Sequence, residues 1–251
     1  MRRYFRIIKG NFQSIISINK LCSICIIFIY LFCVKFTSLN RILSIGKLFE
    51  LTFYGPNNLS DNISEVLFWS LYQFYIIYAI GDYCYRELQI RCVYTITRIG
   101  DKHIWYLCFQ FTCFLACVVY FLFGITIGFI TLSLLNIHLI IIDICRILNT
   151  LAILSLSSYY IMTIYIIIIT MTQKYNQSFL ILITLIYLSI AFGGMLKIDP
   201  FMPLNQGILS KHYISGFSFQ WSYIFLCIMI FFNVIFLNRI IIERDLLEIT
   251  H

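Results

Sequence analysis

The sequence predicts an all-α polytopic membrane protein with six transmembrane helices, an N-terminal amphipathic helix and a cytoplasmic helix between the second and third spans. Two observations predict this class. The chain of 251 residues is 61 % hydrophobic and 18 % aromatic, a composition far outside that of soluble domains. Its apolar residues also gather in runs long enough to cross a bilayer, separated by short charged segments. We therefore expect one transmembrane domain, residues 1–251.

The N-terminal segment, residues 1–20, is predicted to be the amphipathic helix. It contains five basic residues and no acidic residue, with aromatic and aliphatic residues between them. This pattern is typical of helices that lie along a membrane surface. The apolar run that follows, 21–34, is not followed by the small-residue cleavage site of a signal peptide. We interpret it as an uncleaved first span, extended to membrane length by apolar residues before Lys20.

Five further apolar runs predict the remaining spans. They are 66–80, 105–128, 149–172, 179–196 and 221–237. Tryptophans stand at three span boundaries, where we expect them to anchor the chain at the membrane interface. These are Trp69, Trp105 and Trp221.

The segment between the third and fourth spans, 129–148, is apolar but carries Asn136, His138, Asp143 and Arg146. Two full spans with a turn do not fit between Trp105 and Thr150. We therefore predict an external shoulder or a partly re-entrant segment here, with a seventh span as the alternative.

Two long connections are predicted on the external side. Residues 35–65 are weakly hydrophobic and contain a turn signal at positions 55–58. Residues 197–220 are interrupted by two prolines and two glycines, and so are too broken for a span. Asn58 and Asn62 each begin an N-x-S glycosylation pattern, which has meaning only in a eukaryotic, lumenal loop.

The distribution of basic residues predicts that both termini are cytoplasmic. With six spans and the N-terminus inside, the cytoplasmic segments hold twelve Lys and Arg residues and the external segments hold six. This bias follows the positive-inside rule. We therefore expect a multi-pass protein of the cell membrane. A seventh span would move the C-terminal tail outside and weaken the bias.

The polar segment 82–104, between the second and third spans, is predicted to hold the functional contact. It contains Arg86, Glu87, Arg91 and Arg98. On a regular helix, Glu87, Arg91 and Arg98 fall on one face, and Glu87 and Arg91 form a favourable i,i+4 pair. We predict a short basic helix at the membrane surface. The alternative is a loop whose arginines only fix the topology.

Motifs for catalysis, nucleotides and metals do not occur in the sequence. It has no G-x-x-x-x-G-K-[ST] loop, no H-E-x-x-H and no paired carboxylates within a span. Its four histidines form no paired motif, and its basic residues are divided among short segments. We expect no catalytic residue, no metal site, no cofactor and no nucleic-acid partner, so the chain is not expected to be an enzyme.

Two small motifs have other possible meanings. Gly124 and Gly128 form a G-x-x-x-G pattern in the third span, which predicts close packing against another helix. Cys22 and Cys25 form a C-x-x-C pair, which keeps a membrane thiol-redox enzyme as an alternative function. Because the pair follows Lys20 at the predicted cytoplasmic end of a span, that alternative is disfavoured. A eukaryotic multispan receptor is a further alternative, suggested by the glycosylation patterns.

The layout resembles the membrane subunits of type 2 ATP-binding cassette transporters, the bacterial permeases of peptide, lantibiotic and multidrug exporters. The sharpest likeness is Arg86-Glu87, Arg91, Arg98-Ile99-Gly100 and Trp105, which is similar to the family's E-x-x-x-R segment with its following arginine and aromatic residue. The interrupted external stretch before the last span is also similar. The long first external connection and the 129–148 segment depart from the family pattern.

This resemblance implies a function and partners. The 82–104 segment would be the coupling helix, with Arg86, Glu87, Arg91 and Arg98 contacting a separate ATPase subunit. The first, second and fifth spans would line the path of the cargo. A second permease subunit, identical or related, would complete the transporter within the lipid bilayer.

Overall fold

The computed structural model describes residues 2–38, 44–59, 63–133 and 141–243, and gives only the backbone for a few of these, Arg98 among them. Within these ranges the chain is helical and contains no strand. Ser60 and Asn62 of the glycosylation patterns, Asn136 and His138 lie outside the described residues.

Ten α-helices and three shorter helical turns follow one another along the described ranges. They are α1 (Arg2–Ile15), α2 (Ile18–Ser38), α3 (Ile45–Thr52), α4 (Ile63–Arg86), the π-helical turn η1 (Glu87–Arg91), α5 (Cys92–Ile99), α6 (Lys102–Ser133), α7 (Ile141–Thr172), α8 (Tyr175–Leu196), the 3-10 turns η2 (Asp199–Phe201) and η3 (Pro203–Asn205), α9 (Leu209–Ile214) and α10 (Phe219–Glu243).

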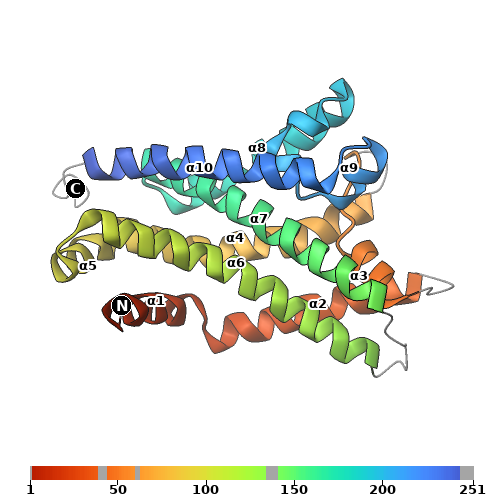
Figure 1. Ribbon diagram of the computed structural model, residues 1–251, viewed down its shortest axis with the longest axis horizontal. Helices are drawn as coiled ribbons and strands as arrows, with labels where there is room; N and C mark the ends of the chain where they lie inside the picture. Colours follow the sequence, from red (N-terminus) through yellow and green to blue (C-terminus); the bar gives the residue numbers. More distant parts are fainter. Residues whose placement is uncertain (1, 39–43, 60–62, 134–140, 244–251) are drawn as a thin grey trace.

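Six of the described helices are long and apolar enough to cross a membrane: α2, α4 with η1, α6, α7, α8 and α10. The prediction of an all-helical chain with six helices of membrane-spanning length and composition is therefore confirmed for the described residues. Figure 1 shows these helices running along one common direction. They form a bundle whose two ends carry the shorter elements.

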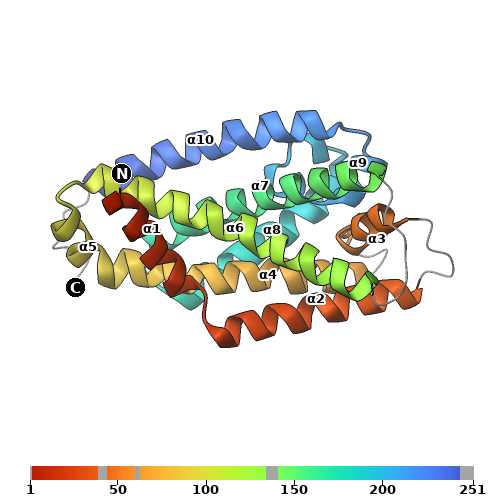
Figure 2. The ribbon, with the colours of Figure 1, turned by 60° about the horizontal axis from the view of Figure 1, so that its bottom comes forward.

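The two ends of the bundle differ in what they carry. At one end, called here the α5 end, lie α1, α5 and the end of α10 (Figures 1 and 2). The turn between α7 and α8 joins them, since Tyr175 stacks edge-on against Tyr85 of α4 at 5.9 Å. At the opposite end, called the α9 end, lie α3 and α9, and the Ser210 amide donates to the Tyr54 carbonyl at 2.8 Å.

Helix α7 lies at the centre of the bundle and packs against α3, α4, α6, α8 and α10. Its polar side chains make hydrogen bonds to three neighbouring helices. The bonds are Gln73–Ser158 at 3.0 Å, Tyr159–Gln110 at 3.0 Å and Asn233–Thr163 at 2.9 Å. Such bonds between membrane helices each contribute about 0.6 kcal/mol. They tie α4, α6 and α10 to one central helix.

The interpretation of 129–148 as a shoulder or re-entrant segment is wrong for its described residues. Helix α6 continues to Ser133 and α7 begins at Ile141, so both ends of the segment extend the two spans. The seven residues between them are too few for a further helix across a bilayer, which needs about 20. The polar residue Asp143 is accommodated because it is buried against Gly46 of α3.

The connection between the first two spans contains a helix that the hydropathy of 35–65 did not predict. Helix α3 begins after Ser44, whose hydroxyl accepts from the Lys47 amide at 3.3 Å, and buries Leu48 and Phe49 within the bundle. Phe49 packs edge-on against Phe32 of α2 at 5.0 Å. Helix α3 is therefore a packed part of the α9 end and closes the bundle between α2 and α7.

Candidate functional site

The predicted contact segment forms the tip of a helical hairpin at the α5 end. Helix α4 runs into the π-helical turn η1 and then into α5, which ends at Gly100 with a φ of 80°. There the Gly100 amide donates to the Ile96 carbonyl at 2.7 Å. Asp101 then begins α6, because its carboxylate accepts from the His103 amide at 2.8 Å. Figure 2 shows α5 as a short helix capping the pair formed by α4 and α6.

Glu87 does not lie on the exposed face with the arginines, contrary to the regular-helix prediction. Its side chain is 2 % exposed, and Glu87 Oε1 accepts a hydrogen bond from the indole N–H of Trp105 at 3.0 Å. The cause is the π-helical turn, which is wound more loosely than an α-helix and changes the angle between successive side chains. No ion pair joins Glu87 to Arg91 within the described part of the chain.

Trp105 is part of the same buried contact rather than an anchor at the lipid interface. It is 1 % exposed and stacks on Phe109 with the ring centroids 5.8 Å apart. Because Glu87 belongs to the hairpin tip and Trp105 to α6, their hydrogen bond fixes the tip against the third span. At this burial, water cannot easily replace the indole donor, so loss of the bond would leave the Glu87 oxygen unsatisfied.

Arg86 and Arg91, by contrast, are exposed. Arg86 Nε donates to Asp82 Oδ1 at 2.9 Å, one helical turn earlier. Asp82 Oδ2 lies 3.7 Å from Lys20 Nζ, which also donates to the Ala79 carbonyl at 2.8 Å. The start of α2 is thus tied to the end of α4. Arg98 belongs to α5, but its side chain lies outside the described residues.

This arrangement can bind an acidic surface. A guanidinium recognises carboxylates through up to five N–H donors in fixed geometry. Arg86 and Arg91 present such groups on a rigid turn, because Glu87 holds the turn to α6. In the described ranges, no group of three His, Cys, Asp or Glu side chains is arranged to hold a metal ion.

The two glycines predicted to allow close helix packing face α2 of the same chain. A Cβ atom on Gly124 would lie 2.5 Å from the Phe28 ring, and one on Gly128 would lie 2.5 Å from the Phe32 ring. Both rings are fully buried. Because Gly124 and Gly128 have no side chain, α2 can pack these two phenylalanines directly against α6.

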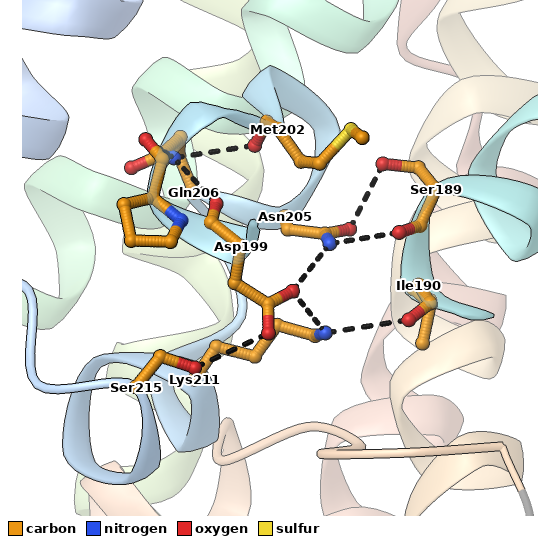
Figure 3. A network of polar contacts seen from close by, with 9 residues as sticks. Ser189, Ile190, Asp199, Met202, Asn205, Gln206, Lys211 and Ser215 are labelled. Carbon is orange, nitrogen blue, oxygen red and sulfur yellow. Dashed lines mark hydrogen bonds and ion pairs between the residues drawn. The ribbon is translucent and has the colours of Figure 1, made fainter. Parts of the chain in front are cut away.

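A second polar cluster, at the α9 end, was not predicted from the sequence (Figure 3). Its centre is the ion pair between Asp199 of η2 and Lys211 of α9, with both side chains almost completely buried. Asp199 Oδ1 also accepts from Asn205 Nδ2 at 2.8 Å, and Asp199 Oδ2 accepts from Ser215 Oγ at 3.2 Å. Burial lowers the pKa of Lys211, and the Asp199 carboxylate opposes this shift.

The rest of the cluster joins this ion pair to the neighbouring helices. Lys211 Nζ donates to the Ile190 carbonyl of α8 at 3.4 Å, and Asn205 Nδ2 donates to the Ser189 carbonyl at 2.9 Å. Gln206 accepts from Ser222 of α10 at 2.5 Å. Each charged group is thus satisfied by groups of the chain itself, so the cluster locks the α8–α10 connection and leaves no coordination position for a ligand.

Comparisons with protein-family models, with curated proteins and with solved structures give no match to this chain.

Proposed function

We propose that the chain is the membrane-spanning permease subunit of an ATP-binding cassette transporter. It would export a peptide, a lantibiotic or another amphipathic compound with ATP hydrolysed by a separate subunit. The observation that supports this most is the hairpin tip at the α5 end, where exposed Arg86 and Arg91 flank Glu87, which is buried against Trp105. A tip that is fixed on one side and positively charged on the other suits docking to a soluble motor.

In this proposal Glu87 positions the tip and does not itself contact the ATPase. Movement of the motor would pull on Arg86 and Arg91, and the Glu87–Trp105 bond would carry the displacement into α6. The Gln73–Ser158 and Tyr159–Gln110 bonds would then pass it from α4 and α6 to α7. Rigid-body rocking of packed helices is an established way to alternate access to a transport path.

The proposed orientation places the α5 end in the cytoplasm of a cell with this chain in its plasma membrane. The support is that α1, α5, the α7–α8 turn and the end of α10 share one end of the bundle. Of the twelve basic residues that the sequence assigns to the inside, against six outside, seven lie in these segments: Arg2, Arg3, Arg6, Lys9, Arg98, Lys174 and Arg239. Both termini would then be cytoplasmic.

A second permease subunit would complete the transporter. Helices α2 and α8 support this part of the proposal because most of the residues in their spans are unburied within the single chain. Together with α4 they would line the cargo path against the second copy or a related chain. No cofactor is needed in the permease, since the chemical energy would be released in the ATPase subunits.

The test is co-purification of nucleotide hydrolysis with the tagged chain from its native membrane. We expect ATPase activity in the purified complex, and a large loss of that activity in the double variant Arg86→Ala/Arg91→Ala. Lys174→Ala is the matched control, because Lys174 is an exposed cation at the same end but in the α7–α8 turn. A chain that transports a cargo alone, or a double variant that retains the activity, would contradict the proposal.

A further inference from the structure

A cleft of about 500 Å³ opens at the α9 end between α3, the first turns of α7, α9 and the start of α10. Figure 2 shows α3, the beginning of α7 and α9 gathered at this end. The volume is within the range of small-molecule sites. The cleft is separate from the Asp199–Lys211 cluster, since neither residue of that pair lines it. It is also at the opposite end of the bundle from the proposed ATPase contact.

The charged groups of the cleft have an excess of positive charge. Lys47 of α3 and Arg146 of α7 are both exposed, and Glu50 is the acidic residue that lines the cleft with them. In the described part of the chain, neither Lys47 nor Arg146 makes an ion pair. Glu50 interacts electrostatically with both cations, and the remaining excess of one positive charge favours an anionic ligand between the two helices.

Asn149 adds a neutral donor to this cationic wall. The Tyr223 hydroxyl of α10 donates to the side-chain oxygen of Asn149 and, at 3.1 Å, to its backbone carbonyl. Because the amide oxygen is used in this way, the NH₂ group of Asn149 remains available to donate. Asn149 lies one helical turn after Arg146 on the same helix, so both side chains can reach the oxygens of one bound anionic group.

The other wall of the cleft is aromatic. Tyr54 and Tyr213 stack with their centroids 6.1 Å apart and their planes at 18°. Phe219 continues this wall, 6.4 Å from Tyr213. An aromatic surface beside cationic donors suits a molecule that has an anionic group and an apolar portion.

The position of the cleft relative to the membrane spans indicates that this amphipathic anion is a lipid. The apolar span of α7 begins at Asp143, and that of α10 begins at Phe219. Arg146, Asn149 and Phe219 therefore lie within the first turns of two spans, where the headgroups of a bilayer lie. A ligand phosphate held there would have its acyl chains beside apolar helix surfaces.

We infer that this cleft binds the phosphate group of an anionic phospholipid, through Lys47, Arg146 and Asn149. The binding fixes a lipid headgroup between α3 and α7 and so stabilises the α9 end of the bundle. This inference does not depend on the proposed transport function.

The test measures thermal stabilisation of the full chain, purified in an uncharged maltoside detergent, by added dioleoyl phosphatidylglycerol. We expect this lipid to raise the melting temperature of the wild-type chain more than dioleoyl phosphatidylcholine does. Lys47→Gln and Arg146→Gln should each weaken the apparent affinity about two- to five-fold, the range for a partly solvated charge pair. Arg146→Lys should restore most of the effect.

Lys197→Gln is the matched control, because Lys197 is an exposed cation at the α9 end that does not line the cleft. It should respond to phosphatidylglycerol like the wild type. Two arms separate the sources of the anion: inorganic phosphate tests the free anion, and dioleoylglycerol tests the acyl chains without a phosphate. Equal stabilisation by either one alone would overturn the inference, and so would unchanged lipid responses in Lys47→Gln and Arg146→Gln. Native mass spectrometry of retained phosphatidylglycerol gives the same comparison without heating.

Discussion

Replacing Lys211 by methionine tests the buried ion pair that locks the α8–α10 connection. The substitution keeps an unbranched side chain of similar length but removes the ammonium group. Asp199 then remains buried without its cation. Removing one partner of a buried ion pair costs about 3–5 kcal/mol. Asp199 keeps hydrogen bonds from Asn205 at 2.8 Å and Ser215 at 3.2 Å, so we expect the low end of that range.

A loss of about 3 kcal/mol corresponds to a fall in melting temperature of about 6–12 °C for a chain of this size. Thermal unfolding in detergent can be followed with a thiol-reactive fluorogenic dye, because Cys84, Cys113 and Cys117 are completely buried and become reactive on unfolding. Lys197→Met is the control, since it removes an exposed cation at the same end and should leave the melting temperature nearly unchanged.

The double variant Asp199→Asn/Lys211→Met makes the test specific. With both charges removed, no carboxylate is left unpaired, and we expect the double variant to be more stable than Lys211→Met alone. If Lys211→Met melted within about 2 °C of the wild type, less than about 1 kcal/mol would be involved and the ion pair would have no stabilising role. A double variant less stable than either single variant would also refute the reasoning.

Three further predictions test other parts of the structure. Trp105→Phe removes the donor to the buried Glu87 carboxylate and should destabilise the hairpin tip by about 1–3 kcal/mol, seen as faster proteolysis within 86–101, while Trp221→Phe at the opposite end should leave that cleavage unchanged. Gly128→Leu should drive α2 away from α6 and lower the yield of folded protein, whereas Gly10→Leu, with nothing within 4 Å of its Cβ position, should not. Burial raises the pKa of Glu50, and the facing cations Arg146 and Lys47 only partly oppose this shift. Its carboxyl is therefore more often neutral at pH 5 than at pH 7, and phosphatidylglycerol should bind about two- to five-fold more tightly at the lower pH. Burial, and then the Glu50 carboxylate, raise the pKa of Tyr54, which remains neutral at both pH values. Glu50→Gln should bind as tightly at pH 7 as at pH 5, and a pH dependence that persists in this variant would exclude Glu50 as its cause.

The spans could be predicted from the sequence because each is a long apolar run, and the bilayer fixes the length that such a run needs. The boundaries near 129–148 were wrong because polar residues were taken to end a span. Asp143 instead lies inside the chain against Gly46 of α3. Hydropathy registers that a residue is polar but not that another helix covers it, so the actual lengths of α6 and α7 depend on packing that the sequence does not display.

Helix α3 could have been found from local signals. Ser44 caps a segment in which Ile45, Leu48, Phe49 and Thr52 recur at helical spacing and are all buried. The helix has only eight residues, and a helix of that length is unstable by itself. Its formation depends on burial against α7 and α2. The helical spacing of these four residues indicates that burial, whereas the overall composition of residues 35–65 does not.

The position of Glu87 shows a different limit. The i,i+4 relation between Glu87 and Arg91 assumes regular α-helical winding, and the π-helical turn between them removes that relation. No residue type specifies a π-helical turn strongly. The buried hydrogen bond to Trp105 supplies the stabilisation instead. The pattern of charges, laid on a regular helix, therefore assigned Glu87 to the exposed side, whereas the fold buries it.

Several of the basic residues counted for the predicted orientation are ion-paired in the folded chain. Lys35 and Lys211 are among the six cations that the sequence assigns to the outside, and the fold pairs them with Glu65 and Asp199. At the other end, Lys20 and Arg86 share Asp82. The positive-inside rule counts Lys and Arg residues near the span ends rather than net charge, since acidic residues contribute little to orientation. Pairing in the finished fold therefore does not alter the count. In the sequence, Lys20, Lys35, Arg86 and Lys211 contribute to the predicted orientation. In the folded chain, the ion pairs of the same residues contribute to stability.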